Sequence, residues 1–235
     1  MASWNRSSLI ARTIPRAPRP FHPGYYQFES GSTYSRVPGS QTQSFGEGLL
    51  RVGVTPRTEL RVGLGSFDIR STSLGREVGF EAASLGAKVI IVQDAAGVMP
   101  NVSLLAASTL PTGDGPFRSS RAEPEAKVAL GWSLTQRVAF TANVSDALLT
   151  EGPERYGEPA ASGSLGVDLT SRLGSYFELF GFFPTAPGTS TSRYLNSGLT
   201  YGFGPNLQVD VRAGLGMNNV GGPDQFFGFG IGRRW

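Results

Sequence analysis

The side chains that hydrolytic enzymes depend on are scarce in this sequence. The chain has one histidine, His22, and no cysteine. Acyl-transfer enzymes pair a nucleophile with a basic side chain, usually histidine, and transition-metal sites draw on His and Cys ligands. Pairs of carboxylates could still perform glycosidase chemistry, but no such pair can be identified. We therefore expect no enzyme, no catalytic residue, no metal site and no cofactor.

Three glycine-containing motifs resemble loops that bind calcium, phosphate or nucleotides. The segment Pro111-Thr112-Gly113-Asp114-Gly115 could be a calcium or phosphate loop, but Asp-Gly close to proline is foremost a turn signal. The repeats at 46–48 and 228–232 lack the strand–turn–helix context that nucleotide-binding loops require. We interpret the first motif as a turn, and we expect the glycines of 228–232 to leave space inside the fold.

The dominant pattern after Pro23 is an alternation of apolar and polar residues with turn residues between the segments. This period of two predicts strands, and no stretch shows helical periodicity. The predicted strands have the ~9 to 11 residues that a tilted membrane-spanning strand needs. They cover 24–34, 44–54, 59–69, 81–93, 101–110, 122–132, 138–148, 161–170, 175–183, 191–201, 207–216 and 225–235.

The connections between these strands alternate in length. Short turns are expected at 55–58, 94–100, 134–137, 171–174 and 202–206, and longer loops at 35–43, 70–80, 111–121, 149–160, 184–190 and 217–224. This is the pattern of a barrel with short periplasmic turns, longer outer loops and both termini on the periplasmic side. The fold class we expect is therefore all-β: a single closed antiparallel transmembrane β-barrel of about twelve strands.

The strand at 207–215 shows how the two faces divide. Leu207, Val209 and Val211 share one face, and the polar residues between them share the other. Alternation alone does not say which face points inward. Aromatic residues next to the short turns and the C-terminus indicate a girdle at the lipid headgroups, so the apolar face should contact lipid. These girdle residues are Trp132, Phe177, Tyr201, Phe203 and Trp235.

The charged residues then belong to the interior, because an Arg or Lys on the lipid face costs roughly 2 to 4 kcal/mol at the midplane. They could fill a narrow barrel as mixed-sign pairs, or they could select solutes, and the sequence leaves both roles open. The residues expected to face the lumen and line a solute pathway are Glu47, Arg51, Glu59, Arg61, Lys88, Lys127, Asp168, Glu178, Asp210 and Arg212.

The N-terminal segment 1–22 differs from the rest of the chain. It carries four arginines and no acidic residue, which leaves 17 Lys and Arg against 18 Asp and Glu from Pro23 onward. The basic balance is thus a property of the tail, and we expect no nucleic-acid partner. With prolines at 15, 18 and 20 and no alternation, 1–22 should form no strand, and the barrel should occupy 23–235.

No secretory signal is visible, because the longest apolar run in the first 22 residues is Leu9-Ile10-Ala11. We expect that the chain begins inside or downstream of such a signal; the alternative is a different location. At the other end, 227–235 resembles the C-terminal signal of outer-membrane barrels and stops on Trp235, although Arg233 departs from the pattern. The resemblance implies that the lipid bilayer and the outer-membrane assembly machinery are partners.

Four segments in order along the chain resemble a known family: GLLRVGVT (48–55), ELRVG (59–63), STLPTGD (108–114) and GPNLQVD (204–210). They are similar to the transporter-like outer-membrane proteins labelled as the MetA pathway of phenol degradation. Segments 25–35 and 225–235 resemble that family's first and last strands. The resemblance implies a barrel that moves small compounds, among which aromatic compounds are candidates.

Together these observations predict a passive channel or transporter for small solutes, hydrophobic or aromatic compounds being candidates, in the outer membrane of a Gram-negative-type bacterium. A non-conducting structural or binding barrel in the same membrane is the first alternative. A soluble β-sandwich or lipocalin-like binding protein is the second.

Overall fold

The computed structural model describes residues 23–93, 95, 97–218 and 222–235. The expectation that 1–22 forms no strand falls outside the described residues. The described chain forms thirteen strands in one sheet, with one short 3-10 helix, η2 (Gly115–Phe117). The strands are β1 (Tyr26–Val37), β2 (Ser40–Thr55), β3 (Thr58–Thr72), β4 (Gly75–Phe80), β5 (Ser84–Val92), β6 (Asn101–Thr109), β7 (Glu123–Ser133), β8 (Val138–Glu151), β9 (Glu154–Asp168), β10 (Leu173–Phe182), β11 (Ser192–Gly202), β12 (Leu207–Gly216) and β13 (Gln225–Arg234).

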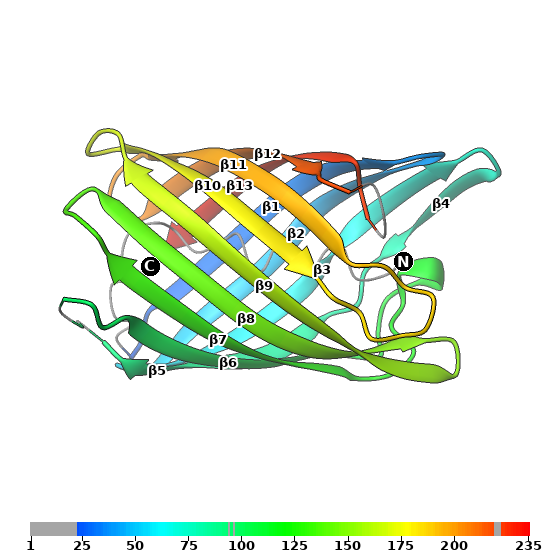
Figure 1. The fold of residues 1–235 in the computed structure, drawn as a ribbon, viewed down its shortest axis with the longest axis horizontal. Helices are drawn as coiled ribbons and strands as arrows, with labels where there is room; N and C mark the ends of the chain where they lie inside the picture. The colour runs from blue at the N-terminus through cyan, green and yellow to red at the C-terminus, as the bar shows by residue number, and fades with distance from the viewer. Residues whose placement is uncertain (1–22, 94, 96, 219–221) are drawn as a thin grey trace.

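Twelve of these strands close into an antiparallel barrel (Figure 1). Each pairs with its neighbours in chain order, and β1 closes the ring by pairing with both β2 and β13. The short turns lie at the end of the barrel that holds the C-terminus, on the left in Figure 1. The predicted all-β fold, a closed barrel of about twelve strands, is confirmed.

The thirteenth strand, β4, lies in the segment 70–80 that was predicted to be a loop. It pairs only with β3, and the two strands form a hairpin beyond the barrel wall (Figure 1). Strand β3 changes partner along its length: Thr58–Gly63 pairs with β5, whereas residues from Phe67 outward pair with β4. Gly65 lies between the two pairings with φ 73°, a left-handed conformation that favours glycine.

The loops predicted at 35–43 and 149–160 are also wrong in their extent. Strands β1 and β2 remain paired to Val37 and Ser40, and β8 and β9 remain paired to Glu151 and Glu154. The ends of these hairpins are mostly polar, as in the run Ser-Gln-Thr-Gln-Ser from residue 40 and in residues 150–155. A strand with water on both sides needs no apolar alternation, so its sequence looks like a loop.

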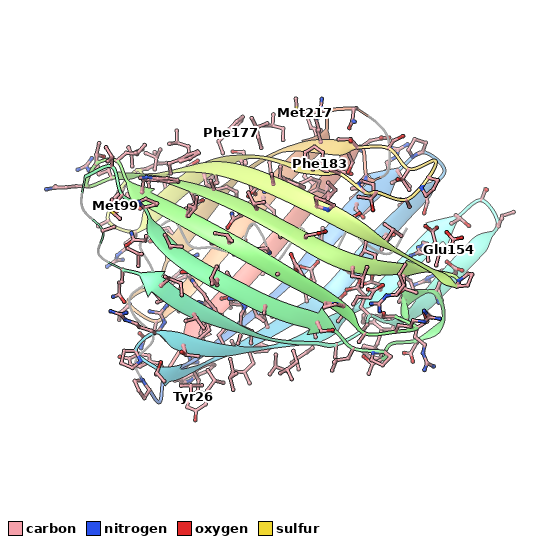
Figure 2. All side chains as sticks on the ribbon, turned by 60° about the horizontal axis from the view of Figure 1, so that its bottom comes forward. Tyr26, Met99, Glu154, Phe177, Phe183 and Met217 are labelled. Carbon is pink, nitrogen blue, oxygen red and sulfur yellow. The ribbon has the colours of Figure 1, made fainter. Side chains whose placement is uncertain are left out.

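The outer surface of the barrel is apolar. Leu60, Leu165 and Val211, from three different strands, are 45%, 42% and 50% exposed. Figure 2 shows the side chains standing off the wall, with Phe177 projecting from it. No described helix has the length and apolarity needed to cross a membrane.

Most of the predicted aromatic girdle is exposed as well. Phe177, Tyr201, Phe203 and Trp235 are exposed, and Tyr201 packs edge-on against Phe203 with ring centroids 4.9 Å apart. Trp132 is half-buried, and its indole Nε1 donates a hydrogen bond to the carbonyl oxygen of Val98 at 3.0 Å. The rings of Trp and Tyr, with an apolar body and one polar group, suit a membrane–water interface.

Candidate functional site

The inner surface of the barrel is where polar side chains are buried. Because the wall is a single layer, a side chain that is buried on a membrane-length strand points into the barrel. Of the ten charged residues predicted to face the lumen, six are buried: Glu47, Arg51, Glu59, Lys127, Glu178 and Arg212. The other four, Arg61, Lys88, Asp168 and Asp210, are half-buried.

Arg51 is the centre of an ion-pair network near the short-turn end. Its Nη2 and Nε donate to the two carboxylate oxygens of Glu59 at 2.8 and 2.9 Å. Its Nη1 donates to Glu29 Oε1, also at 2.9 Å, and Arg61 Nη1 donates to Glu59 Oε1 at 2.7 Å. One guanidinium thus joins β1, β2 and β3, and the fork of Arg matches the carboxylate of Glu59 with two parallel hydrogen bonds.

The network extends to residues that the sequence reasoning did not include. Gln27 Nε2 donates to Glu29 Oε1 at 2.6 Å, and Gln27 Oε1 accepts from Arg234 Nη2 at 2.8 Å. Lys88 is the direct cross-strand partner of Glu59 on β5. Gln27 and Glu29 alternate with Tyr26 and Phe28 on β1, so period two could have assigned both to the lumen.

A second group of polar side chains lies farther along the barrel. Asn196 Nδ2 donates to Glu178 Oε2 at 3.2 Å, and these two side chains are 1% and 2% exposed. Arg212 Nη2 donates to Thr33 Oγ1 at 3.0 Å, and its guanidinium carbon lies 5.7 Å from the ring centroid of Phe226. This group spans β1, β10, β11, β12 and β13.

Two glycines on β13 make room for inward charges. A Cβ at Gly228 would lie 2.6 Å from Arg212 Nε, and one at Gly230 would collide with the Asp210 carboxylate. Arg212 and Asp210 are the cross-strand partners of these glycines on β12. The repeat at 228–232 therefore serves to let neighbouring charged side chains fold across the strand inside the barrel.

Acidic side chains gather toward the long-loop end of β2, β3 and β7. Glu47, Asp68 and Glu123 are buried there, and the hydroxyl of Ser66 lies 2.7 Å from Asp68 Oδ1 and 2.8 Å from Glu81 Oε2. Among the described residues no group of three or more possible ligand side chains is arranged to hold a metal ion. This part of the inner wall is thus acidic.

Aromatic rings cover another part of the inner wall near the same end. Phe180 stacks on Tyr194 with ring centroids 4.9 Å apart, and Phe182 and Phe226 lie 6.0 and 6.4 Å from Phe180. These four rings and Ala160 form one buried cluster, which we call the inner aromatic cluster. Phe180 and Phe182 follow Glu178 by two and four residues and share its face of β10, so the sequence contained the signal for this cluster, although we did not predict it.

Of the predicted charges, Arg51, Glu59, Arg61 and Lys88 lie together, whereas Asp168 lies apart from them at the last residue of β9. The inner surface as a whole carries paired charges, hydrogen-bonding groups and aromatic rings. That the ten charges form a solute pathway stays a prediction.

Solved structures with the same fold include an outer-membrane channel and two porins. An outer-membrane channel from Pseudomonas putida F1 has a TM-score of 0.71 and 16% identity, with coverage of 95% of this chain and 100% of that chain. The NanC porin has a TM-score of 0.59 and 8% identity, covering 87% and 97%. The KdgM porin has a TM-score of 0.55 and 12% identity, covering 87% and 98%. At these identities the likeness shows the fold alone.

No curated protein matches the sequence. The family model described as "Putative MetA-pathway of phenol degradation" matches residues 21–235, which is most of the chain and all of the barrel. The family that the four short motifs resemble is thus the family whose model spans the fold. The chain belongs to the MetA-pathway of phenol degradation family.

Proposed function

We propose that this protein is an outer-membrane channel through which small solutes pass passively, and that hydrophobic or aromatic compounds are among them. The observation that carries the proposal is a closed twelve-strand barrel with an apolar outer face and a charged, partly aromatic inner face. Only a membrane leaves such an outer face without a covering partner. The outer-membrane channel and porins that share the fold support the same role.

The width of the barrel supports a narrow pore. Side chains fill a barrel of about eight strands, and barrels of about sixteen leave an aqueous channel, so twelve strands leave an intermediate space. The paired arginines and glutamates occupy part of it. Passage should therefore be restricted to small molecules.

A non-conducting barrel is the second candidate, and one observation favours it. The inward side chains are tightly packed: Glu178, Asn196, Tyr194 and Phe226 are all at most 2% exposed. If such packing continues across the lumen, no solute passes. Flux measurements separate the two candidates.

The inner aromatic cluster gives the channel proposal a specific test. In proteoliposomes that contain the full chain, phenyl glucoside should enter faster than methyl glucoside, although it is larger, because its ring can insert among the packed rings of the inner aromatic cluster and replace their mutual contacts. Replacing Phe180 and Phe226 by alanine should lower this preference several-fold. Phe177→Ala with Phe229→Ala is the matched control, since these two rings on the same strands are exposed on the outside.

Osmotic swelling rates give the flux of each glucoside. Rates that follow size alone, with methyl glucoside the faster, would indicate a channel without aromatic preference. If neither glucoside enters faster than in empty liposomes, the non-conducting barrel is the better account.

A further inference from the structure

We propose that the short-turn rim of the barrel is a binding surface for the phosphate headgroups of anionic phospholipids. The inference rests on the proposed membrane location, because the rim meets lipid only if the barrel spans a bilayer. Its residues are four exposed arginines from three turns and the C-terminal strand. We call Arg57, Arg137, Arg172 and Arg233 the rim arginines.

Three of the rim arginines occupy the same position in turns that share one hydrogen bond. In each turn a threonine hydroxyl oxygen accepts a hydrogen bond from the backbone N–H of the arginine two residues later, at 3.1 to 3.2 Å. This bond is a local side-chain-to-backbone turn motif. The three pairs are Thr55 with Arg57, Thr135 with Arg137, and Thr170 with Arg172.

These turns connect β2 to β3, β7 to β8 and β9 to β10, so the arginines are spread around the barrel. The fourth, Arg233, is at the end of β13, and its guanidinium carbon lies 5.2 Å from the ring centroid of Trp235. None of the four forms an ion pair within the described part of the chain. Four exposed guanidinium groups at one rim are thus unneutralised by the described residues.

The surroundings of the rim arginines indicate lipid and not free anion. Leu134, Leu169 and Phe203, in the short turns or at their edges, are 56%, 47% and 61% exposed, and Trp235 is 55% exposed. Apolar and aromatic residues of this kind sit at the acyl boundary of a bilayer, which places neighbouring guanidinium groups at the level of the phosphates. Arginine binds phosphate with two parallel hydrogen bonds, and an anionic membrane surface attracts it.

The opposite rim differs in its charge. The five short turns, 55–58, 94–100, 134–137, 171–174 and 202–206, contain one acidic residue, Asp94. At the long-loop end, exposed arginines stand among exposed acidic residues, as Arg76 does beside Glu77 and Arg155 beside Glu154. Figure 2 places Glu154 at that end, with Tyr26 and Met99 at the end of the short turns. The short-turn rim thus carries exposed arginines with a single acidic residue among its turns, and it is the better match for an anionic surface.

Native mass spectrometry of the full chain in detergent micelles tests the proposal. Phosphatidylglycerol and phosphatidylcholine with the same acyl chains are added, and retained copies of each are counted. The wild type should retain phosphatidylglycerol preferentially. In the variant R57Q/R137Q/R172Q/R233Q the preference for phosphatidylglycerol should fall about tenfold or more, because each basic residue near an anionic surface contributes binding free energy.

The matched control is R36Q/R118Q/R121Q/R155Q, which removes four exposed arginines from the long-loop end. It should keep the wild-type preference. An equal loss in the control, or no loss in the rim variant, would overturn the proposal. Should the fourfold rim variant fail to fold, R57Q, R137Q and R172Q are measured singly, and each should lower the preference several-fold.

Inorganic phosphate added to the wild type separates a lipid site from a simple anion site. Phosphatidylglycerol should stay bound when the concentration of inorganic phosphate is far above that of the lipid. Displacement of the lipid by phosphate at a concentration similar to its own would contradict the lipid proposal. The glucoside flux of the rim variant should equal that of the wild type, because the glucosides carry no charge and none of the predicted lumenal residues is changed. Wild-type protein that binds phosphatidylglycerol but carries no solute would refute the proposed channel and leave this inference standing.

Discussion

Replacing Arg51 by alanine should lower the free energy of unfolding by about 3 to 5 kcal/mol, the usual cost of removing one partner of a buried ion pair. The side chains of Glu29 and Glu59 are only 9% and 5% exposed, and both lose their shared guanidinium in the variant. Arg61 remains beside Glu59 but does not reach Glu29 through any described ion pair. Urea unfolding in liposomes, followed by gel mobility of the folded barrel, measures the loss.

Two further variants identify the cause of that loss. Arg51→Lys should cost less, because the charge remains while the fork of parallel hydrogen bonds is lost. Adding Glu59→Gln to the alanine variant should recover part of the stability, because one buried charge is removed along with its partner. If Arg51→Ala is as stable as the wild type, the network does not hold β1, β2 and β3 together.

Replacing Leu165 by arginine should destabilise the folded barrel in a bilayer by about 1 to 2 kcal/mol, between the cost of a basic residue on the lipid face at the midplane and the smaller cost near the interface. Leu165 is 42% exposed and lies inside β9, a few residues from the short turn. Its charge would face hydrocarbon with no partner. The same unfolding assay measures the effect.

Ser164→Arg is the matched control one position earlier on the same strand. Ser164 is the cross-strand partner of the inward-facing Glu178, so an arginine there enters the lumen beside a carboxylate. Its cost should be much smaller than that of Leu165→Arg. Equal costs at the two positions would show that the apolar face of β9 does not contact lipid.

The membrane-spanning parts of the strands could be predicted because lipid on one side and a polar lumen on the other impose strict alternation. In β12, for example, Leu207, Val209 and Val211 alternate with Gln208, Asp210 and Arg212, and the predicted strand 207–216 has the observed bounds. Where this constraint ends, prediction failed. Strand β4 and the tips of the β1–β2 and β8–β9 hairpins extend beyond the wall, where both faces are polar or exposed.

The same constraint explains what could be predicted of the inner surface. The alternation of inward and outward residues placed Arg51, Glu59 and Arg61 on the inner face. It could not show that Arg51 bridges to Glu29 on β1, because the register between strands depends on tertiary pairing. The inner aromatic cluster was missed for a different reason. Aromatic residues occur on both faces of a membrane barrel, so Phe180 could be assigned inward only by counting from Glu178.

Planar-bilayer recording of the full chain tests the central claim most directly, namely that the barrel conducts small solutes through its charged lumen. The wild type should give small, discrete conductance steps. Arg212→Ala should give larger steps, because the Arg212 side chain extends over β13 on the inner wall to Thr33 on β1, beside Phe226, and its removal leaves more space in the lumen. No steps above the empty bilayer from the wild type and none from the variant would contradict the account and leave a structural barrel.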